Sequence, residues 1–97
     1  MNKLVMIVYN EAIESEVMEV LRNCGLENYT KITQVFGKGK SSGTHLGTDV
    51  WPGKNNILYV ACEEKNAQEI ISFIRELRKK FKHEGVKAFV LPVEEVT

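Results

Sequence analysis

The segment Phe36–Asn56, between two stretches of strand-like composition, contains the residues best suited to binding chemistry in this 97-residue chain. It holds five of the seven glycines, and so long a connection in a small domain is usually functional or disordered. Glycines let a ligand approach the backbone closely, successive N–H groups can bind an anion, and lysines add positive charge. We therefore consider two alternatives for the start of the segment, an anion site and a loop base without a ligand. The candidate ligand-binding residues are Gly37, Lys38, Gly39, Lys40 and Ser41.

The second part of the segment contains side chains that could bind a metal ion or a protein partner. His45 and Asp49 could bind a divalent metal together with His83 from a neighbouring subunit. Two histidines without a closely spaced further ligand fall short of a strong metal signature, so solvated polar side chains are the alternative. Trp51 either packs against a subunit or, with His45 and Asp49, belongs to a partner-binding loop, because exposed tryptophans often anchor interfaces.

Composition and charge exclude several classes of function. Thirteen acidic and thirteen basic residues cancel, which argues against a partner that is nucleic acid or a membrane surface. No apolar stretch is long enough to span a membrane and no signal peptide is recognisable, so a protein that is cytoplasmic and not membrane-embedded is expected. Cys24 and Cys62 are too few for a disulfide framework. No nucleophile or acid–base constellation indicates an enzyme.

The elements expected to position these residues form a single domain, 1–97. Apolar, β-branched runs predict strands, and apolar spacing of three and four residues predicts two helices. The first helix is expected to end at Gly25, and the second to begin with Asn66 as N-cap and Glu69 completing a capping box. The predicted strands are 3–9, 29–36, 56–62 and 87–91, the predicted helices 13–24 and 66–81, and the long loop about 37–55.

This order, β-α-β, long loop, β-α-β, predicts an α+β, ferredoxin-like βαββαβ sandwich with both helices on one face of a four-stranded antiparallel sheet. Side chains alternate along a strand, so Val5, Ile7 and Tyr9 face one way and Leu4, Met6 and Val8 the other. Both sets contain apolar side chains, which predicts that another subunit covers the second face of the sheet.

The whole architecture, with a long loop after the second strand, resembles the PII nitrogen-regulatory signalling family. Gly37–Gly43 resembles the segment that opens the family's T-loop, and Lys87–Val96 resembles its last strand and the Pro-Val-Glu-Glu segment that follows. The resemblance implies a homotrimer with small-molecule effectors such as ATP, ADP or AMP bound between subunits. It also implies a T-loop that engages a transporter, an enzyme or a regulator. Lys87 occupies the place of the family's phosphate-contacting lysine.

The sequence also departs from the family pattern. The segment 80–87 has one displaced glycine in place of the Thr-Gly and Gly-Asp-Gly-Lys patterns, and no basic pair follows the last strand up to Thr97. No tyrosine lies in the long loop, so the uridylylation site of some members has no counterpart. Nucleotide binding of the usual kind is therefore left open. The alternative is a divalent-metal-binding trimer, since CutA-type metal-tolerance proteins are built similarly.

Overall fold

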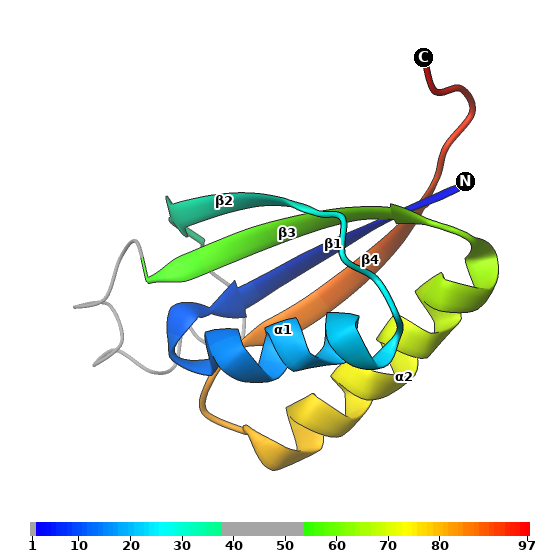
Figure 1. Cartoon of the computed structure of the whole chain (residues 1–97). Helices are drawn as coiled ribbons and strands as arrows, with labels where there is room; N and C mark the ends of the chain where they lie inside the picture. The colour runs from blue at the N-terminus through cyan, green and yellow to red at the C-terminus, as the bar shows by residue number, and fades with distance from the viewer. Residues whose placement is uncertain (1, 38–53) are drawn as a thin grey trace.

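In the part of the chain that the structure describes, four strands and two helices form two layers, with the sheet on one side and both helices on the other (Figure 1). The structure is a computed structural model that describes residues 2–37 and 54–97. The elements in order are β1 (Lys3–Asn10), the 3-10 turn η1 (Glu11–Ile13), α1 (Glu14–Asn23), β2 (Thr30–Val35), β3 (Asn55–Cys62), α2 (Glu64–Lys80) and β4 (Val86–Pro92).

The four-stranded sheet has the order β2-β3-β1-β4, and every neighbouring pair is antiparallel. This arrangement confirms the predicted ferredoxin-like fold. Each predicted strand is present, with ends that differ by one residue at most. The alternation prediction for β1 is also confirmed, because Val5, Ile7 and Tyr9 are buried between the sheet and the helices.

The core lies between the sheet and the two helices. Alternate residues of β1 and β3 pack there against one apolar stripe from each helix, because strands repeat every two residues and helices every 3.6. Each pair of residues that lies directly opposite across the sheet shares a face, so Val5 with Val60 and Ile7 with Leu58 belong to the core. The buried residues that the helices contribute are Ile13, Val17, Val20, Leu21, Ala67, Ile70 and Ile74.

The predicted end of the first helix is confirmed, and the predicted start of the second is wrong. Gly25 follows α1 in the left-handed conformation, with a φ of 71°. The helix α2 begins before Asn66, with Glu63 as its N-cap and no side-chain cap. Ala67 is fully buried, and its N–H donates to the carbonyl of Glu63 at 3.0 Å. The main chain is therefore already helical before Asn66, and the N-cap lies three residues earlier than predicted.

No helix within residues 2–37 and 54–97 combines the length and the apolar character that crossing a membrane requires.

Candidate functional site

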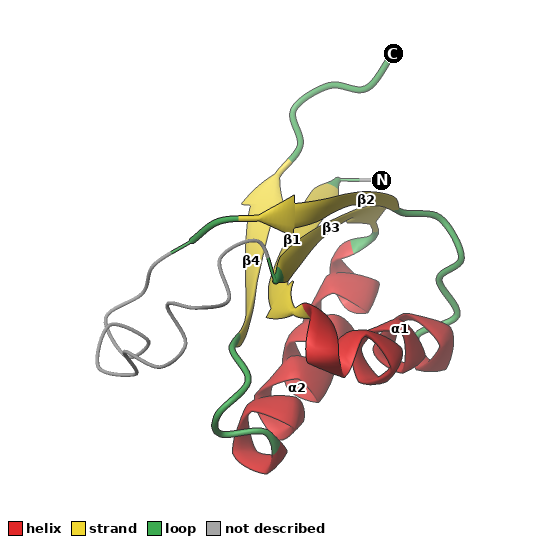
Figure 2. Cartoon of the chain, turned by 90° about the vertical axis from the view of Figure 1, so that its left-hand side faces the viewer, coloured by secondary structure: helices red, strands yellow, loops and turns green. Residues whose placement is uncertain are grey.

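Both ends of the long β2–β3 connection lie at the same end of the sheet, which we call the loop end. There β2 finishes at Val35, β3 begins at Asn55, β1 finishes at Asn10 and β4 begins at Val86. Figure 2 faces this end of the molecule.

Main-chain hydrogen bonds join the connections at the loop end. The N–H of Asn10 donates to the carbonyl of Gly85 at 2.9 Å, and the N–H of Glu11 donates to the carbonyl of Lys54 at 2.7 Å. The last residue of β1 therefore contacts the α2–β4 connection, and the turn after β1 contacts the last residue before β3.

Of the predicted ligand-binding residues, Gly37 and Lys87 lie in the described part of the chain, and both are exposed at the loop end. Lys87 is the second residue of β4 and lies opposite Val8, so its side chain is on the sheet face that the helices do not cover. It makes no ion pair with any described residue. The remaining residues of the predicted anion site, Lys38, Gly39, Lys40 and Ser41, fall outside the described residues.

Within one chain, Gly37 and Lys87 lie at opposite lateral edges of the sheet. Gly37 follows β2, Lys87 belongs to β4, and β3 and β1 lie between these strands. Strands are spaced about 4.8 Å apart, so the two edges are roughly 14 Å from one another. Within one subunit, the backbones of these two residues therefore lie at opposite edges of the sheet.

The predicted metal site stays a prediction. His45, Asp49 and also Trp51 lie outside the described residues, and His83 is exposed in the connection between α2 and β4. Among the residues that the structure describes, no three His, Cys, Asp or Glu side chains gather as a metal ion would require.

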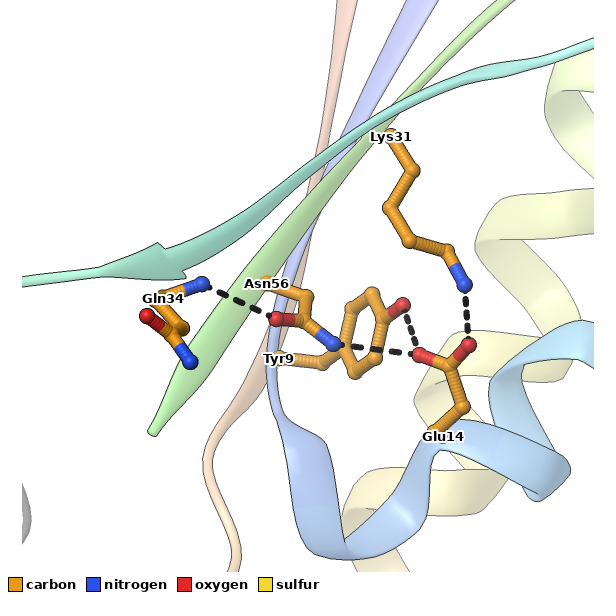
Figure 3. Close-up of polar contacts among 5 residues, drawn as sticks. All are labelled: Tyr9, Glu14, Lys31, Gln34 and Asn56. Atoms are coloured by element: carbon orange, nitrogen blue, oxygen red, sulfur yellow. Dashed lines mark hydrogen bonds and ion pairs between the residues drawn. The ribbon is translucent and has the colours of Figure 1, made fainter. Parts of the chain in front are cut away.

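A cluster of polar side chains lies beside the loop end and joins four secondary-structure elements (Figure 3). Its acceptor is the carboxylate of Glu14, the first residue of α1. The hydroxyl of Tyr9 and the Nζ of Lys31 both donate to this carboxylate, and the Nδ2 of Asn56 donates to its Oε1 at 3.2 Å. Glu14 therefore links α1 to β1, β2 and β3. The backbone N–H of Gln34 donates to the Oδ1 of Asn56 at 3.3 Å. We call Tyr9, Glu14, Lys31, Gln34 and Asn56 the Glu14 cluster.

The environment of the cluster shifts two pKa values in opposite directions. Burial raises the pKa of Tyr9 above its ordinary value, and the hydrogen bond to the Glu14 carboxylate raises it further. Partial burial acts to raise the pKa of Glu14, but the hydrogen bonds from Lys31, Tyr9 and Asn56 outweigh it and lower the pKa. The cluster is thus held as a neutral phenol and an ionised carboxylate over the physiological pH range.

A hollow of about 580 Å³ adjoins the Glu14 cluster at the loop end. Glu11 and Glu14 place two carboxylates on its wall, and Lys54 is the one cation among its described lining residues. That lysine already lies 3.5 Å from the carboxylate of Glu11. With two carboxylates and one lysine that is already paired, the described lining of this hollow does not favour an anion. The residues lining it are Asn10, Glu11, Ala12, Glu14, Lys54 and Asn56.

Sequence reasoning missed the Glu14 cluster, although two signals for it were present. Tyr9 ends the stripe that Val5 and Ile7 begin, and Asn56 begins the stripe that Leu58 and Val60 continue. A polar group at the end of a buried stripe requires a hydrogen-bond partner. The pairing of Tyr9 with Asn56 across β1 and β3 could not be predicted without the register of the sheet.

A family profile and the solved structures both point to one family. The sequence profile described as nitrogen regulatory protein P-II matches residues 2–97. A PII-like signalling protein from Thermus thermophilus is 28% identical, with a TM-score of 0.69 over 95% of this chain and 85% of that one. A comparison with curated proteins gave no match.

CPII, a nitrogen regulatory PII-like protein from Thiomonas intermedia, is a second structural neighbour. Its complex with ADP, AMP and bicarbonate is 15% identical, with a TM-score of 0.67 over 99% of this chain and 96% of that one. Its apo form is 14% identical, with a TM-score of 0.62 over 95% of this chain and 90% of that one. At these identities the likeness to CPII establishes a shared fold alone.

Proposed function

Because the chain belongs to the nitrogen regulatory protein P-II family, we propose that it is a cytoplasmic regulator that senses a small anionic ligand at the clefts between the subunits of a homotrimer. The proposed ligand is an adenine nucleotide. The long loop, about 37–55, then controls a transporter, an enzyme or another regulator. This role is regulatory rather than enzymatic. The family match and the neighbours give no support to the metal-binding alternative.

The observation that carries this proposal is the position of Gly37 and Lys87 in the sheet. Both lie at the loop end, but β3 and β1 separate the strands that hold them. A second copy whose β4 edge approaches the β2 edge of the first would bring the lysine of one subunit to the glycine segment of the other. The CPII complex with ADP and AMP supports a nucleotide as the ligand.

The uncovered face of the sheet supports an oligomer. The face opposite the helices presents Ile32, Phe89 and Leu91, which keep 43%, 43% and 42% of their surface exposed. Leu4, Met6 and Val8 lie between them in the sheet register. A continuous apolar face of this kind usually marks an interaction surface.

Calorimetric titration of the protein with ADP, ATP and AMP tests the ligand. We expect binding of at least one nucleotide, and a loss of about tenfold or more in affinity in Lys87→Ala, as expected when one charge-assisted hydrogen bond is removed. The matched control is Lys65→Ala, an exposed lysine at the start of α2. It should bind like the wild type.

Two outcomes would contradict the proposal. If the wild-type protein binds none of the three nucleotides, the proposed ligand class is wrong. If Lys87→Ala and Lys65→Ala weaken binding equally, Lys87 acts only through the overall charge. Titration with zinc and copper in the same buffer tests the metal-binding alternative. That alternative predicts a response to metal that is lost in His45→Ala.

A further inference from the structure

The strand that leads into the long loop contains a bulge. Ile32 pairs with Ile57 and Val35 pairs with Asn55, so Thr33 and Gln34 together stand opposite Asn56. A two-against-one arrangement of this kind bends a strand and redirects the chain that follows it. The bulge lies shortly before Gly37, and it therefore sets the direction in which the chain leaves the sheet.

The bulge holds Gln34 in a conformation that L residues avoid. Its φ is 56°, and it is the one non-glycine residue with a positive φ among those that the structure describes. The left-handed region costs a residue with a Cβ roughly 1–2 kcal/mol. Contacts elsewhere in the fold must therefore hold this backbone in place.

Asn56 makes that contact. Its Oδ1 accepts the N–H of Gln34 at 3.3 Å, while its Nδ2 donates to the Oε1 of Glu14 at 3.2 Å. Asn56 is only 5% exposed, so neither half of its amide can exchange these partners freely for water. Figure 3 shows the resulting line of hydrogen bonds from Glu14 through Asn56 to the backbone of Gln34.

The orientation of the Asn56 amide is itself fixed. Glu14 is an ionised acceptor, so the NH₂ group must face it, and the carbonyl oxygen must then face the bulge. Tyr9 and Lys31 donate to the same carboxylate and hold it in position. The first turn of α1 therefore decides which atom of Asn56 meets the strand.

We propose that Glu14 and Asn56 are positioning residues that hold the left-handed bulge at Gln34 and thereby orient Gly37 at the entrance of the long loop. The expected effect on ligand affinity rests on the proposed function. The expected effect on the orientation of Gly37 does not depend on it. A substitution of Glu14 or Asn56 therefore alters the entrance of the long loop through these hydrogen bonds, without removing a contact to the ligand.

A double-mutant cycle observed by nuclear magnetic resonance tests this proposal. In Asn56→Ala the amide signal of Gly37 should move, because Gln34 leaves the left-handed region once its hydrogen bond is lost. Glycine adopts a positive φ without a Cβ penalty. The Asn56→Ala change should therefore move the Gly37 signal much less when it is made in a Gln34→Gly protein.

A matched control distinguishes an effect on the orientation of Gly37 from a general loss of stability. Asn66 also joins two elements through its amide, donating to the carbonyl of Cys24 at 3.5 Å and to Glu69 at 3.4 Å. Asn66→Ala and Asn56→Ala should both lower Tm, the latter by about 5–10 °C. Only Asn56→Ala should move the Gly37 signal. If the signal stays in place while Tm falls, Asn56 is a stabilising contact and the proposal is wrong.

Glu14→Gln provides a second variant if Asn56→Ala does not fold. It keeps the shape of the side chain and removes the charge that orients the amide, so a smaller shift of Gly37 in the same direction is expected. An unmoved signal overturns the proposal.

ADP titration then separates the positioning role from the proposed function. An affinity that is about threefold to tenfold weaker in Asn56→Ala supports the link to the ligand. Absence of ADP binding by the wild type contradicts the proposed function, while the Gly37 signal still decides the positioning role.

Discussion

Glu14 is the residue that holds the polar cluster beside the loop end together through its charge. Three donors from three strands converge on its carboxylate, and they lower its pKa although partial burial opposes the shift. A carboxylate with a lowered pKa in the folded state stabilises the protein above its ordinary pKa and loses that contribution as the pH falls through the lowered value. The stability of this protein should therefore fall at acid pH partly through Glu14.

This effect can be measured by comparing the wild type with Glu14→Gln in denaturant unfolding between neutral and acid pH. The wild type should be more stable at neutral pH, because its carboxylate accepts charge-assisted hydrogen bonds that an amide oxygen does not. The difference should shrink as the pH falls below about 4.5, the ordinary value for Glu14. A difference that stays constant through this range would show that the charge does not stabilise the fold.

At the scale of elements, the C-terminus of α1 shows how local sequence specifies a structure. The N–H of Leu26 donates to the carbonyl of Leu21 at 2.9 Å, and the N–H of Gly25 donates to that of Arg22 at 3.0 Å. These two bonds form a Schellman motif, which requires a left-handed residue after the helix. Gly25 supplies it, and the sequence predicted this helix end correctly.

Gly25→Ala should cost about 1 kcal/mol and lower Tm by about 4–8 °C for a domain of this size. A Cβ at this position would meet no atom within 4 Å, so the cost is confined to the backbone. Gly85→Ala is the matched control, because Gly85 has equal space and does not have a left-handed φ. It should leave Tm unchanged or raise it slightly. Equal losses in both variants would contradict the assignment.

The start of α2 and the bulge in β2 show where local reasoning fails. Asn66 has the sequence of an N-cap, but α2 already begins at Glu64, and Ala67 packs in the core. Nothing in the sequence around Gln34 signals a left-handed residue, because Asn56 that holds it is 22 positions away. Tertiary contacts overrule local preference at both positions.

At the scale of the whole molecule, the uncovered face of the sheet is the feature on which the proposed trimer rests. We expect light scattering to give a mass about three times the 11.0 kDa of one chain. Phe89→Asp should dissociate this assembly, because it places an unpaired charge in the apolar contact. Phe73→Asp is the matched control, since Phe73 lies on α2 with 39% of its surface exposed against 43% for Phe89.

The control variant should keep the mass of the wild type. A wild-type protein with the mass of one chain would contradict the proposed trimer and the ligand site between its subunits. Dissociation by both variants would show that the two substitutions act through general destabilisation rather than through the sheet face.

The sequence by itself determined the order of the elements, the two faces of β1 and the end of α1, because periodicity, strand composition and a single glycine act over a few residues. The family also followed from local motifs, Gly37–Gly43 and Lys87–Val96, and the profile match over residues 2–97 confirmed it. The ligand roles predicted for Gly37 and Lys87 stay predictions.

Only the tertiary structure decided how residues distant in sequence meet. It placed Gly37 and Lys87 at opposite edges of one sheet. It also brought Glu14 and Asn56 to the bulge at Gln34. The physical reason is that strand order and register are set by long-range pairing and by the shared core, and a one-residue slip would turn Asn56 to the other face.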